Sequence, residues 1–221
     1  MEEKKMIKVI VDGAEYAYPQ GVPYRVIAAD FQQRFPCDIL LVNRDGKLCE
    51  LHKPLDRDCS LKMITAQDIP GIQTYERSAV FLMLKAFYDV GGRENVERIC
   101  VEYSLSRALF IHAQGGFVLD QALLERVEER MRELSAQALP IEKRSIGTDD
   151  AIELFQRERL LHKAQLLSFR IDSHVNVYSL DGFVDYFYGY MVPDTGYIKC
   201  FGLQLFEDGF VLRLPTRGDP D

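Results

Sequence analysis

DYFYGYMVPDTGYIKCF, residues 185–201, is the stretch that decides the fold, and it is interpreted together with YERSAVFLML at residues 75–84. The second stretch has the composition of a buried helix. Arg77 and Phe81 are four residues apart in it, so their side chains lie on the same helix face. We therefore expect Arg77 and Phe81 to contact the same neighbouring element.

Phe187 and Met191 have the same spacing in the first stretch, and we expect them to face a common cleft with the helical pair. Side chains that converge from two elements are typical of a metal site or of a His/Cys hydrolytic site. None of the four supplies a useful lone pair, because a guanidinium stays protonated, a phenyl ring has nothing to donate and a thioether is a weak ligand. The sequence therefore predicts a cleft with the shape of an active site and without its chemistry.

Composition indicates an ordinary globular protein of 221 residues, with 47% apolar and 28% charged residues. Its five cysteines are odd in number and contain no Cys-x-x-Cys pair, which favours reduced thiols in a cytoplasm. The start of the chain is too acidic for a signal peptide, and no apolar run reaches membrane-spanning length. The net charge of −7 disfavours nonspecific nucleic-acid binding, although local basic clusters leave a specific RNA contact open.

The first part of the chain predicts a small sheet crossed by one helix. Strand-like runs at 6–11 and 14–18 flank Asp12-Gly13, which is a favourable hairpin turn. Residues 24–31 repeat apolar side chains at helical spacing. Three short strand-like runs follow, at 39–42, 47–51 and 61–64. The order ββαβββ predicts a β-grasp domain over residues 1–68.

The second part predicts a helix-covered sheet. A strongly apolar helix is expected from Thr74, as its N-cap, to about Val90. Asp120 is the expected N-cap of an amphipathic helix whose run of Glu and Arg, from Glu125 to Arg132, is most simply a solvated face. Strands are expected at 98–103, 108–112, 141–146, 174–180, 183–189, 197–206 and 210–214, and further helices at 148–157 and 160–169.

These patterns predict an α+β fold with two domains. The boundary is expected at the Pro70 region, which separates a domain at 1–68 from a domain at 69–215. Residues 216–221 are polar and are expected to be a linker stub.

The chain resembles a family over most of its length. Residues 6–67 resemble a TGS domain, the β-grasp module of threonyl-tRNA synthetases, with VNRDGKL at 42–48 and ITAQD at 64–68. Residues 70–206 resemble the second additional domain of that enzyme, a fold that also performs editing in the alanyl enzymes. The matching motifs are Arg77-Ser78, RMREL at 130–134, Gly189, VPDT at 192–195 and FGL at 201–203.

In the editing relatives, the helix carries His-Ser-x-x-x-His or a close variant, and a later strand carries Cys-x-x-x-His just before Val-Pro. By this resemblance the two helical histidines fall on Arg77 and Phe81, the cysteine on Phe187 and the last histidine on Met191. All four are replaced. The resemblance therefore implies a degenerate editing site with no catalytic residue and no metal.

A closer resemblance is to certain bacterial uridine-kinase-like nucleoside kinases, in which a TGS domain and a degenerate synthetase-like domain precede a P-loop kinase. The matching stretches are LPIEKRS at 139–145, FVDYFYGYM at 183–191 and FVLRLP at 210–215. The sequence has no Gly-x-x-x-x-Gly-Lys-Ser/Thr motif. The resemblance implies that the kinase domain, with its ATP and Mg²⁺, lies beyond Asp221 and that this chain binds no cofactor.

The ligand-binding candidates are Arg77, Asp185, Tyr186, Tyr188 and Tyr190. Tyrosines offer stacking and hydroxyl contacts to a base or ribose, and an arginine beside a cleft pairs with a phosphate or carboxylate. An ordinary aromatic strand face and an ion pair of Arg77 with Glu76 or Asp185 are the structural alternatives.

Three histidines and Cys200 are expected to have structural roles. His112, His162 and His174 show no metal spacing, and Cys200 is most simply a buried thiol. Two basic clusters, Lys143-Arg144 and Arg157 to Lys163, either touch RNA or solvate helix ends.

Two functions from different classes remain. The first is a noncatalytic binding or regulatory region of a nucleoside (uridine) kinase, with an RNA or nucleotide-like ligand. The second is a hydrolase that acts in trans on aminoacyl-tRNA through rewired residues.

Overall fold

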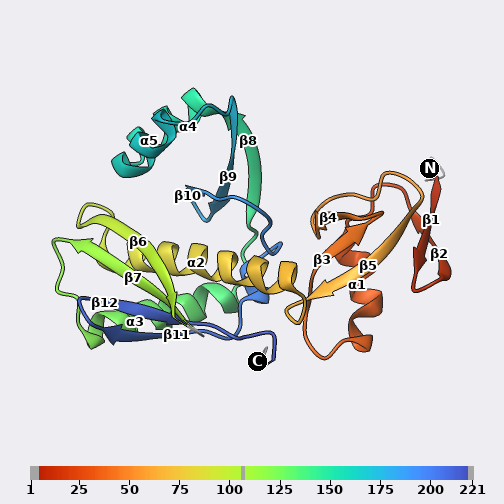
Figure 1. The fold of residues 1–221 in the computed structure, drawn as a ribbon, viewed down its shortest axis with the longest axis horizontal. Coiled ribbons are helices and arrows are strands. Elements are labelled where there is room, and N and C mark those ends of the chain that lie inside the picture. Colours follow the sequence, from red (N-terminus) through yellow and green to blue (C-terminus); the bar gives the residue numbers. More distant parts are fainter. Residues whose placement is uncertain (1–4, 106–107, 219–221) are drawn as a thin grey trace. The chain divides into compact units, whose positions relative to one another are not determined.

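The computed structural model of the protein describes residues 5–105 and 108–218 and has the expected α+β composition (Figure 1). Its contacts divide the chain into two units. Unit 1 comprises Met1–Arg77, Tyr190–Pro193 and Pro215–Asp221, and unit 2 comprises Ser78–Gly189 and Asp194–Leu214. Within the described residues, no helix is long and apolar enough to span a bilayer.

Unit 1 contains a five-stranded sheet in the order β2-β1-β5-β3-β4, in which β1 and β5 run parallel. Helix α1 (Tyr24–Phe31) buries Tyr24, Ile27, Ala28 and Phe31, which confirms the predicted apolar face. A short 3-10 helix, η1, follows at Gln32–Arg34. The strands are β1 (Met6–Val11), β2 (Ala14–Pro19), β3 (Ile39–Arg44), β4 (Lys47–Glu50) and β5 (Cys59–Thr65). All five predicted strands are present, and β3 and β5 are longer than predicted.

The turn between β1 and β2 is the predicted Asp12-Gly13 hairpin. Both residues have positive φ, 51° and 82°, the backbone conformation that tight hairpin turns require and that glycine adopts without strain. Asp45-Gly46 and Asp181-Gly182 repeat this conformation at two further hairpins.

Helix α2 (Ile69–Gly91) begins five residues before the predicted start, so the prediction that Thr74 is the N-cap is wrong. Thr74 lies inside the helix, where its hydroxyl donates to Pro70 O at 2.8 Å. Proline is well suited to the first helical turn because its missing N–H has no partner there. Gly71 permits this early start, because a Cβ atom at that position would lie 1.8 Å from Thr65 O. The first turn therefore packs directly on the end of β5.

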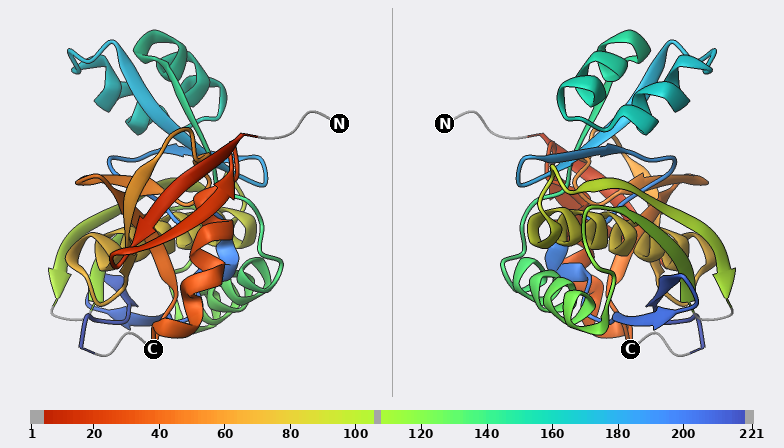
Figure 2. Two further views of the ribbon diagram at one scale, coloured as in Figure 1. Left: turned by 90° about the vertical axis from the view of Figure 1, so that its right-hand side faces the viewer. Right: turned by 90° about the vertical axis from the view of Figure 1, so that its left-hand side faces the viewer.

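Unit 2 contains a four-stranded antiparallel sheet in the order β11-β12-β7-β6, with α2 and α3 (Gln121–Ala136) on one face (Figures 1 and 2). Phe87 of α2 stacks on Phe210 with ring centroids 5.8 Å apart. Asp120 caps α3 as predicted and accepts the N–H of Leu123 at 2.8 Å. The strands are β6 (Val96–Leu105), β7 (Ala108–Gly115), β11 (Gly202–Phe206) and β12 (Gly209–Arg213).

A second sheet of unit 2 has the order β10-β9-β8 and is accompanied by α4 and α5 (Figure 1). Its strands are β8 (Glu142–Gly147), β9 (His174–Leu180) and β10 (Phe183–Tyr186), and its helices are α4 (Thr148–Arg157) and α5 (Leu161–Ser168). The helix starts and ends agree with the sequence to within one residue.

Two strands of unit 2 are shorter than predicted. The strand expected at 183–189 ends at Tyr186, which is its last residue paired with β9. Farther along, Gly189 has a φ of 101° and its carbonyl accepts the Tyr178 hydroxyl at 2.8 Å, so the expected extended backbone does not continue there. The strand expected at 197–206 begins only at Gly202. A 3-10 turn, η2 (Thr195–Tyr197), precedes it, and Asp194 caps this turn by accepting the N–H of Gly196 at 3.0 Å.

Candidate functional site

Helix α2 carries Phe81 into an aromatic cluster of unit 2. Phe81 is fully buried, and its ring centroid lies 5.4 Å from that of Phe187 and 5.6 Å from that of Phe183. Tyr178 packs against Phe187 in a T-shaped arrangement at 6.4 Å. Phe81 and Phe187 are thus brought together, as the sequence predicted. Their contact is one of packed rings, which offers no lone pair to a metal or a proton.

The other two positions of the predicted cleft belong to unit 1. Arg77 Nη1 donates to Tyr190 O at 2.6 Å. Met191 is buried, and its N–H donates to Glu50 Oε1 at 3.1 Å. These contacts fix the backbone of the segment that carries Met191. A cleft shared by all four positions stays a prediction from the sequence.

Asp185, a predicted ligand-binding residue, is a buried carboxylate on β10 with 1% of its surface exposed. Its Oδ2 accepts from Lys163 Nζ of α5 at 3.0 Å, and its Oδ1 accepts the N–H of Tyr186 at 2.7 Å. Lys163 Nζ also lies 5.5 Å from the centroid of the Tyr186 ring, a cation–π distance. A carboxylate (Asp185), an ammonium (Lys163) and an aromatic ring (Tyr186) therefore lie next to one another.

Burial shifts the pKa values of Asp185 and of two neighbouring side chains. Burial raises the pKa of Asp185, while the Lys163 ammonium opposes this rise. Burial and then the Asp185 carboxylate raise the pKa of Tyr88 to about 12, so its hydroxyl stays protonated. Burial, Lys163 and then Arg98 lower the pKa of His162 to about 4. His162 is therefore a neutral imidazole at physiological pH and a poor proton acceptor.

The three tyrosines do not share one strand face. Tyr186 is on β10, and its ring lies 5.9 Å from that of Phe155. Tyr188 lies beyond the strand and is 56% exposed, with the Arg170 guanidinium 4.3 Å from its ring centroid. Tyr190 belongs to unit 1. The predicted strand at 183–189 therefore carries only the first of these tyrosines, because β10 ends at Tyr186.

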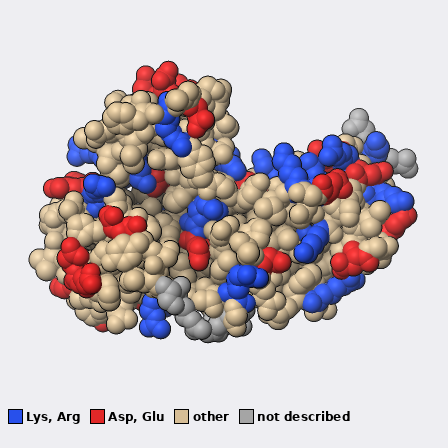
Figure 3. Space-filling view, viewed as in Figure 1, with Lys and Arg blue, Asp and Glu red and all other residues tan. Residues whose placement is uncertain are grey.

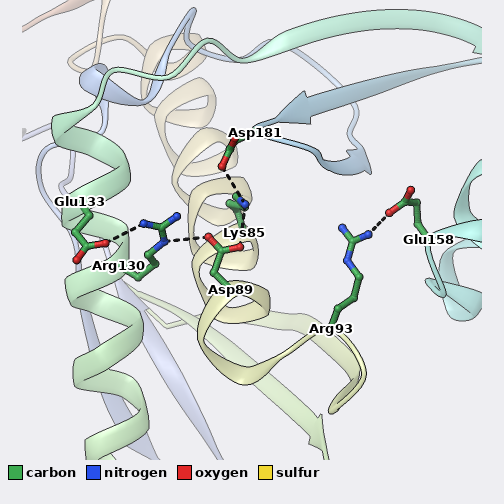
Figure 4. Close-up of polar contacts among 7 residues, drawn as sticks. All are labelled: Lys85, Asp89, Arg93, Arg130, Glu133, Glu158 and Asp181. Atoms are coloured by element: carbon green, nitrogen blue, oxygen red, sulfur yellow. Dashed lines mark hydrogen bonds and ion pairs between the residues drawn. The ribbon is translucent and has the colours of Figure 1, made fainter.

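Ion pairs attach the β9–β10 hairpin and α4 to the end of α2 (Figure 4). Lys85, which is 8% exposed, pairs with Asp89 at 2.8 Å and with Asp181 of the hairpin turn at 3.4 Å. Arg93 pairs with Glu158, just after α4. Because Asp185 is on this hairpin, these pairs hold the Asp185–Lys163 site against α2.

The charged face of α3 was predicted to be solvated, and this is wrong for two of its residues. Arg130 Nε donates to Asp89 Oδ2 at 3.0 Å, and its Nη1 donates to Glu133 at 2.9 Å (Figure 4). Glu128 Oε2 accepts the N–H of Leu203 at 2.7 Å. The neighbouring ends of α2 and β11 supply partners that sequence periodicity does not reveal.

Replacing Arg130 by methionine is expected to lower the free energy of unfolding by about 1–2 kcal/mol, because it removes charge-assisted hydrogen bonds to two carboxylates. The matched Arg132→Met variant should change it by less than about 0.5 kcal/mol, because Arg132 is more exposed and its ion pairs with Glu128 and Glu129 lie within α3. Urea denaturation measures both values. Equal changes in the free energy of unfolding would show that the Arg130 contacts stabilise the protein no more than those of Arg132.

In the described part of the chain, no three His, Cys, Asp or Glu side chains gather closely enough to hold a metal ion.

Comparison with known proteins identifies threonine–tRNA ligases as relatives, and no family model matches the chain. The ligase of Porphyromonas gingivalis is 27% identical over 209 residues, which is 90% of this chain and 30% of the relative. The ligase of Thermotoga neapolitana is 27% identical over 200 residues, with 89% and 30% covered. The ligase of Halorhodospira halophila is 26% identical over 193 residues, with 87% and 30% covered.

The chain thus spans about 30% of the length of these relatives and is similar to one region of a threonine–tRNA ligase. This agrees with the synthetase-like part of the sequence resemblance. The relatives lend no support to a nucleoside kinase as the parent protein.

Sequence reasoning missed Lys163 as a site residue and assigned it to a basic cluster at a helix end. Lys163 is in α5 and Asp185 is in β10, with strand β9 between the two elements, so no local pattern links them. The available signal was indirect: a carboxylate on an apolar strand requires a partner when it is buried.

Proposed function

We propose that this chain is a noncatalytic binding region, related to part of the threonine–tRNA ligases, that recognises an RNA or nucleotide-like ligand. The observation that carries the proposal is the direct packing of Phe81 on Phe187. These rings stand where the resemblance requires a histidine and a cysteine. A site without proton-transferring or metal-binding groups retains binding as its function.

Lys163 and Tyr186 suit such a ligand, and the buried Asp185 carboxylate holds Lys163 in place. The ammonium is partly exposed and has three N–H groups, so it can donate to oxygens of the ligand as well as to Asp185. The Tyr186 ring is partly exposed and offers a stacking surface to a base. Burial of Asp185 strengthens its bond to Lys163 because water competes with it less, and this fixes the position of the ammonium.

Isothermal titration with unacylated tRNA, uridine and AMP tests this proposal. We expect at least one probe to bind, and Tyr186→Leu to weaken that binding about tenfold through loss of stacking. Phe169→Leu is the control, because Phe169 is 78% exposed and lies outside the site. If no probe binds, or if both variants bind like the parent protein, the proposal fails.

The likeness to threonine–tRNA ligases favours one second candidate, a deacylase that acts in trans on aminoacyl-tRNA. Hydrolysis of mischarged tRNA that is abolished by Arg77→Met or Asp185→Asn would support this activity. Rates equal to the uncatalysed reaction would reject it. The low pKa of His162 argues against this imidazole as the general base at neutral pH.

We also propose the finer assignments that rest on sequence resemblance: a TGS β-grasp domain at 1–68, a synthetase-like domain at 69–215 and a linker at 216–221. The mixed sheet with one crossing helix in unit 1 supports the first. A parent nucleoside kinase is a further proposal, carried by resemblance alone. A P-loop motif encoded downstream of residue 221 would support it, and a ligase catalytic domain there would refute it.

A further inference from the structure

The outer face of the sheet β11-β12-β7-β6 carries a row of aromatic side chains. Tyr103 is paired directly with Phe110 across β6 and β7, and their rings stack with centroids 4.9 Å apart. Phe206 of β11 packs against Phe110 at 5.9 Å in a T-shaped arrangement. We call Tyr103, Phe110 and Phe206 the aromatic row. It runs across the strands.

The aromatic row lies on the face that α2 and α3 leave uncovered. Phe210, which stacks on Phe87 of α2, is paired with Ile111. Successive side chains of a strand point to opposite faces, so Phe110 points away from the helices. This face is turned toward the viewer in Figure 1, and Figure 2 shows it from the side.

A glycine makes room for the aromatic row. Gly209 is paired with Phe206, and a Cβ atom there would lie 2.3 Å from Ile111 O and 2.9 Å from the Phe110 ring. Phe110 is consequently buried at 5% exposure, whereas Tyr103 and Phe206 remain 46% and 38% exposed. The row therefore has a fixed centre and two rings that face solvent.

Carboxylates are the chain neighbours of both exposed rings: Glu102 precedes Tyr103, and Glu207 and Asp208 follow Phe206 at the β11–β12 turn. Partial desolvation and then Glu207, Asp208 and Glu102 raise the pKa of Tyr103. Glu207 and Asp208 lie between β11 and β12, and Asp208 Oδ2 lies 3.7 Å from His112 Nε2. In Figure 3, carboxylates lie among uncharged atoms over this part of the molecule.

We propose that the aromatic row is a docking surface for a basic peptide segment of a protein partner. A lysine or arginine side chain of the partner lies over the Tyr103 or Phe206 ring, within the distance at which a cation is attracted to an aromatic face. Glu102, Glu207 and Asp208 neutralise its charge and guide the encounter. We propose a basic segment as the partner because its charge is opposite to that of these carboxylates.

Aromatic rows on sheets also stack nucleic-acid bases, and here the charges decide against that ligand. The three carboxylates repel a phosphate backbone. Arg98 and Arg213 share the face of the aromatic row, because their partners Gln114 and Ala108 lie an even number of residues from Phe110 along β7. Both lie beyond the row along the strands, whereas Glu102 and Glu207 are the direct chain neighbours of Tyr103 and Phe206.

Fluorescence anisotropy with the whole chain and a labelled peptide of alternating Arg and Gly tests the proposal. We expect saturable binding that Tyr103→Ala and Phe206→Ala each weaken about five- to thirtyfold, the loss of one cation–π contact. Glu207→Lys should weaken binding further and reduce its salt dependence. Because both rings are partly exposed, the variants should stay folded, which thermal melting verifies. Tyr103→Leu replaces Tyr103→Ala if the latter unfolds.

Matched controls separate docking from general attraction to an acidic protein. Phe169→Ala removes an exposed ring elsewhere, and Glu153→Lys makes the same charge change on α4; both should bind the peptide like the parent chain. The proposal is overturned if the peptide does not bind, or if the ring variants bind it unchanged. It is also overturned if the ring variants lose binding only to a single-stranded oligouridylate, which would indicate nucleic acid.

Discussion

Replacing Lys163 by methionine is expected to lower the free energy of unfolding by about 3–5 kcal/mol at neutral pH, because the Asp185 carboxylate would remain buried without its ionic partner. Methionine keeps the unbranched shape of the side chain up to the ε position and removes the ammonium, so the main change is the loss of charge. Urea denaturation measures the difference.

The loss should depend on pH. Burial raises the pKa of Asp185, and without Lys163 nothing of comparable strength opposes that rise. The folded variant then holds the Asp185 proton to a higher pH than the unfolded chain does. Its stability is therefore closest to that of the parent at pH values below the unfolded pKa, and it falls as the pH rises through the folded pKa.

The double variant Lys163→Met/Asp185→Asn is the decisive control. It removes both charges and should recover a large part of the lost stability. Lys62→Met, at an exposed lysine of β5, should have little effect. A single variant as stable as the parent, or a deficit that is independent of pH, would show that Asp185 does not need Lys163.

Replacing Phe81 by alanine is expected to lower the free energy of unfolding by about 3–5 kcal/mol, because it opens a cavity between α2 and the β9–β10 hairpin. Phe81 is fully buried, and its ring contacts both Phe183 and Phe187. Phe81→Leu should cost less, since it keeps much of the volume. Phe169→Ala, at a ring that is 78% exposed, should change stability by less than about 0.5 kcal/mol.

This prediction also bears on the proposed loss of catalysis. If the cluster of Phe81, Phe183 and Phe187 stabilises unit 2, the former donor positions have become part of its core. A Phe81→Ala variant with unchanged stability would contradict that view and leave the space available to a ligand.

Local patterns allowed much of the fold to be predicted from the sequence. The Asp12-Gly13 turn, the Asp120 cap and the buried stripe of α3 depend on residues close together in the chain, and all three are confirmed. Helix and strand periodicity located nearly every element for the same reason.

Contacts between distant segments were not predictable in this way. The start of α2 depends on the close approach of Gly71 to the Thr65 carbonyl, which the residues adjacent in sequence do not specify. The turn at Gly189 includes a hydrogen bond from the Tyr178 hydroxyl of β9, and the role of Lys163 depends on Asp185. Charge runs are equally ambiguous, because Arg130 finds its partner Asp89 on another helix.

The assignment of Tyr190–Pro193 to unit 1 has a practical consequence for protein expression. A gene fragment that stops after Arg77 would lack Met191, whose N–H reaches the buried Glu50 carboxylate. It would also lack Arg217, which donates to Gln67 O at 2.8 Å. Such a fragment is expected to be less stable than unit 1 in the intact chain, and limited proteolysis would reveal the difference.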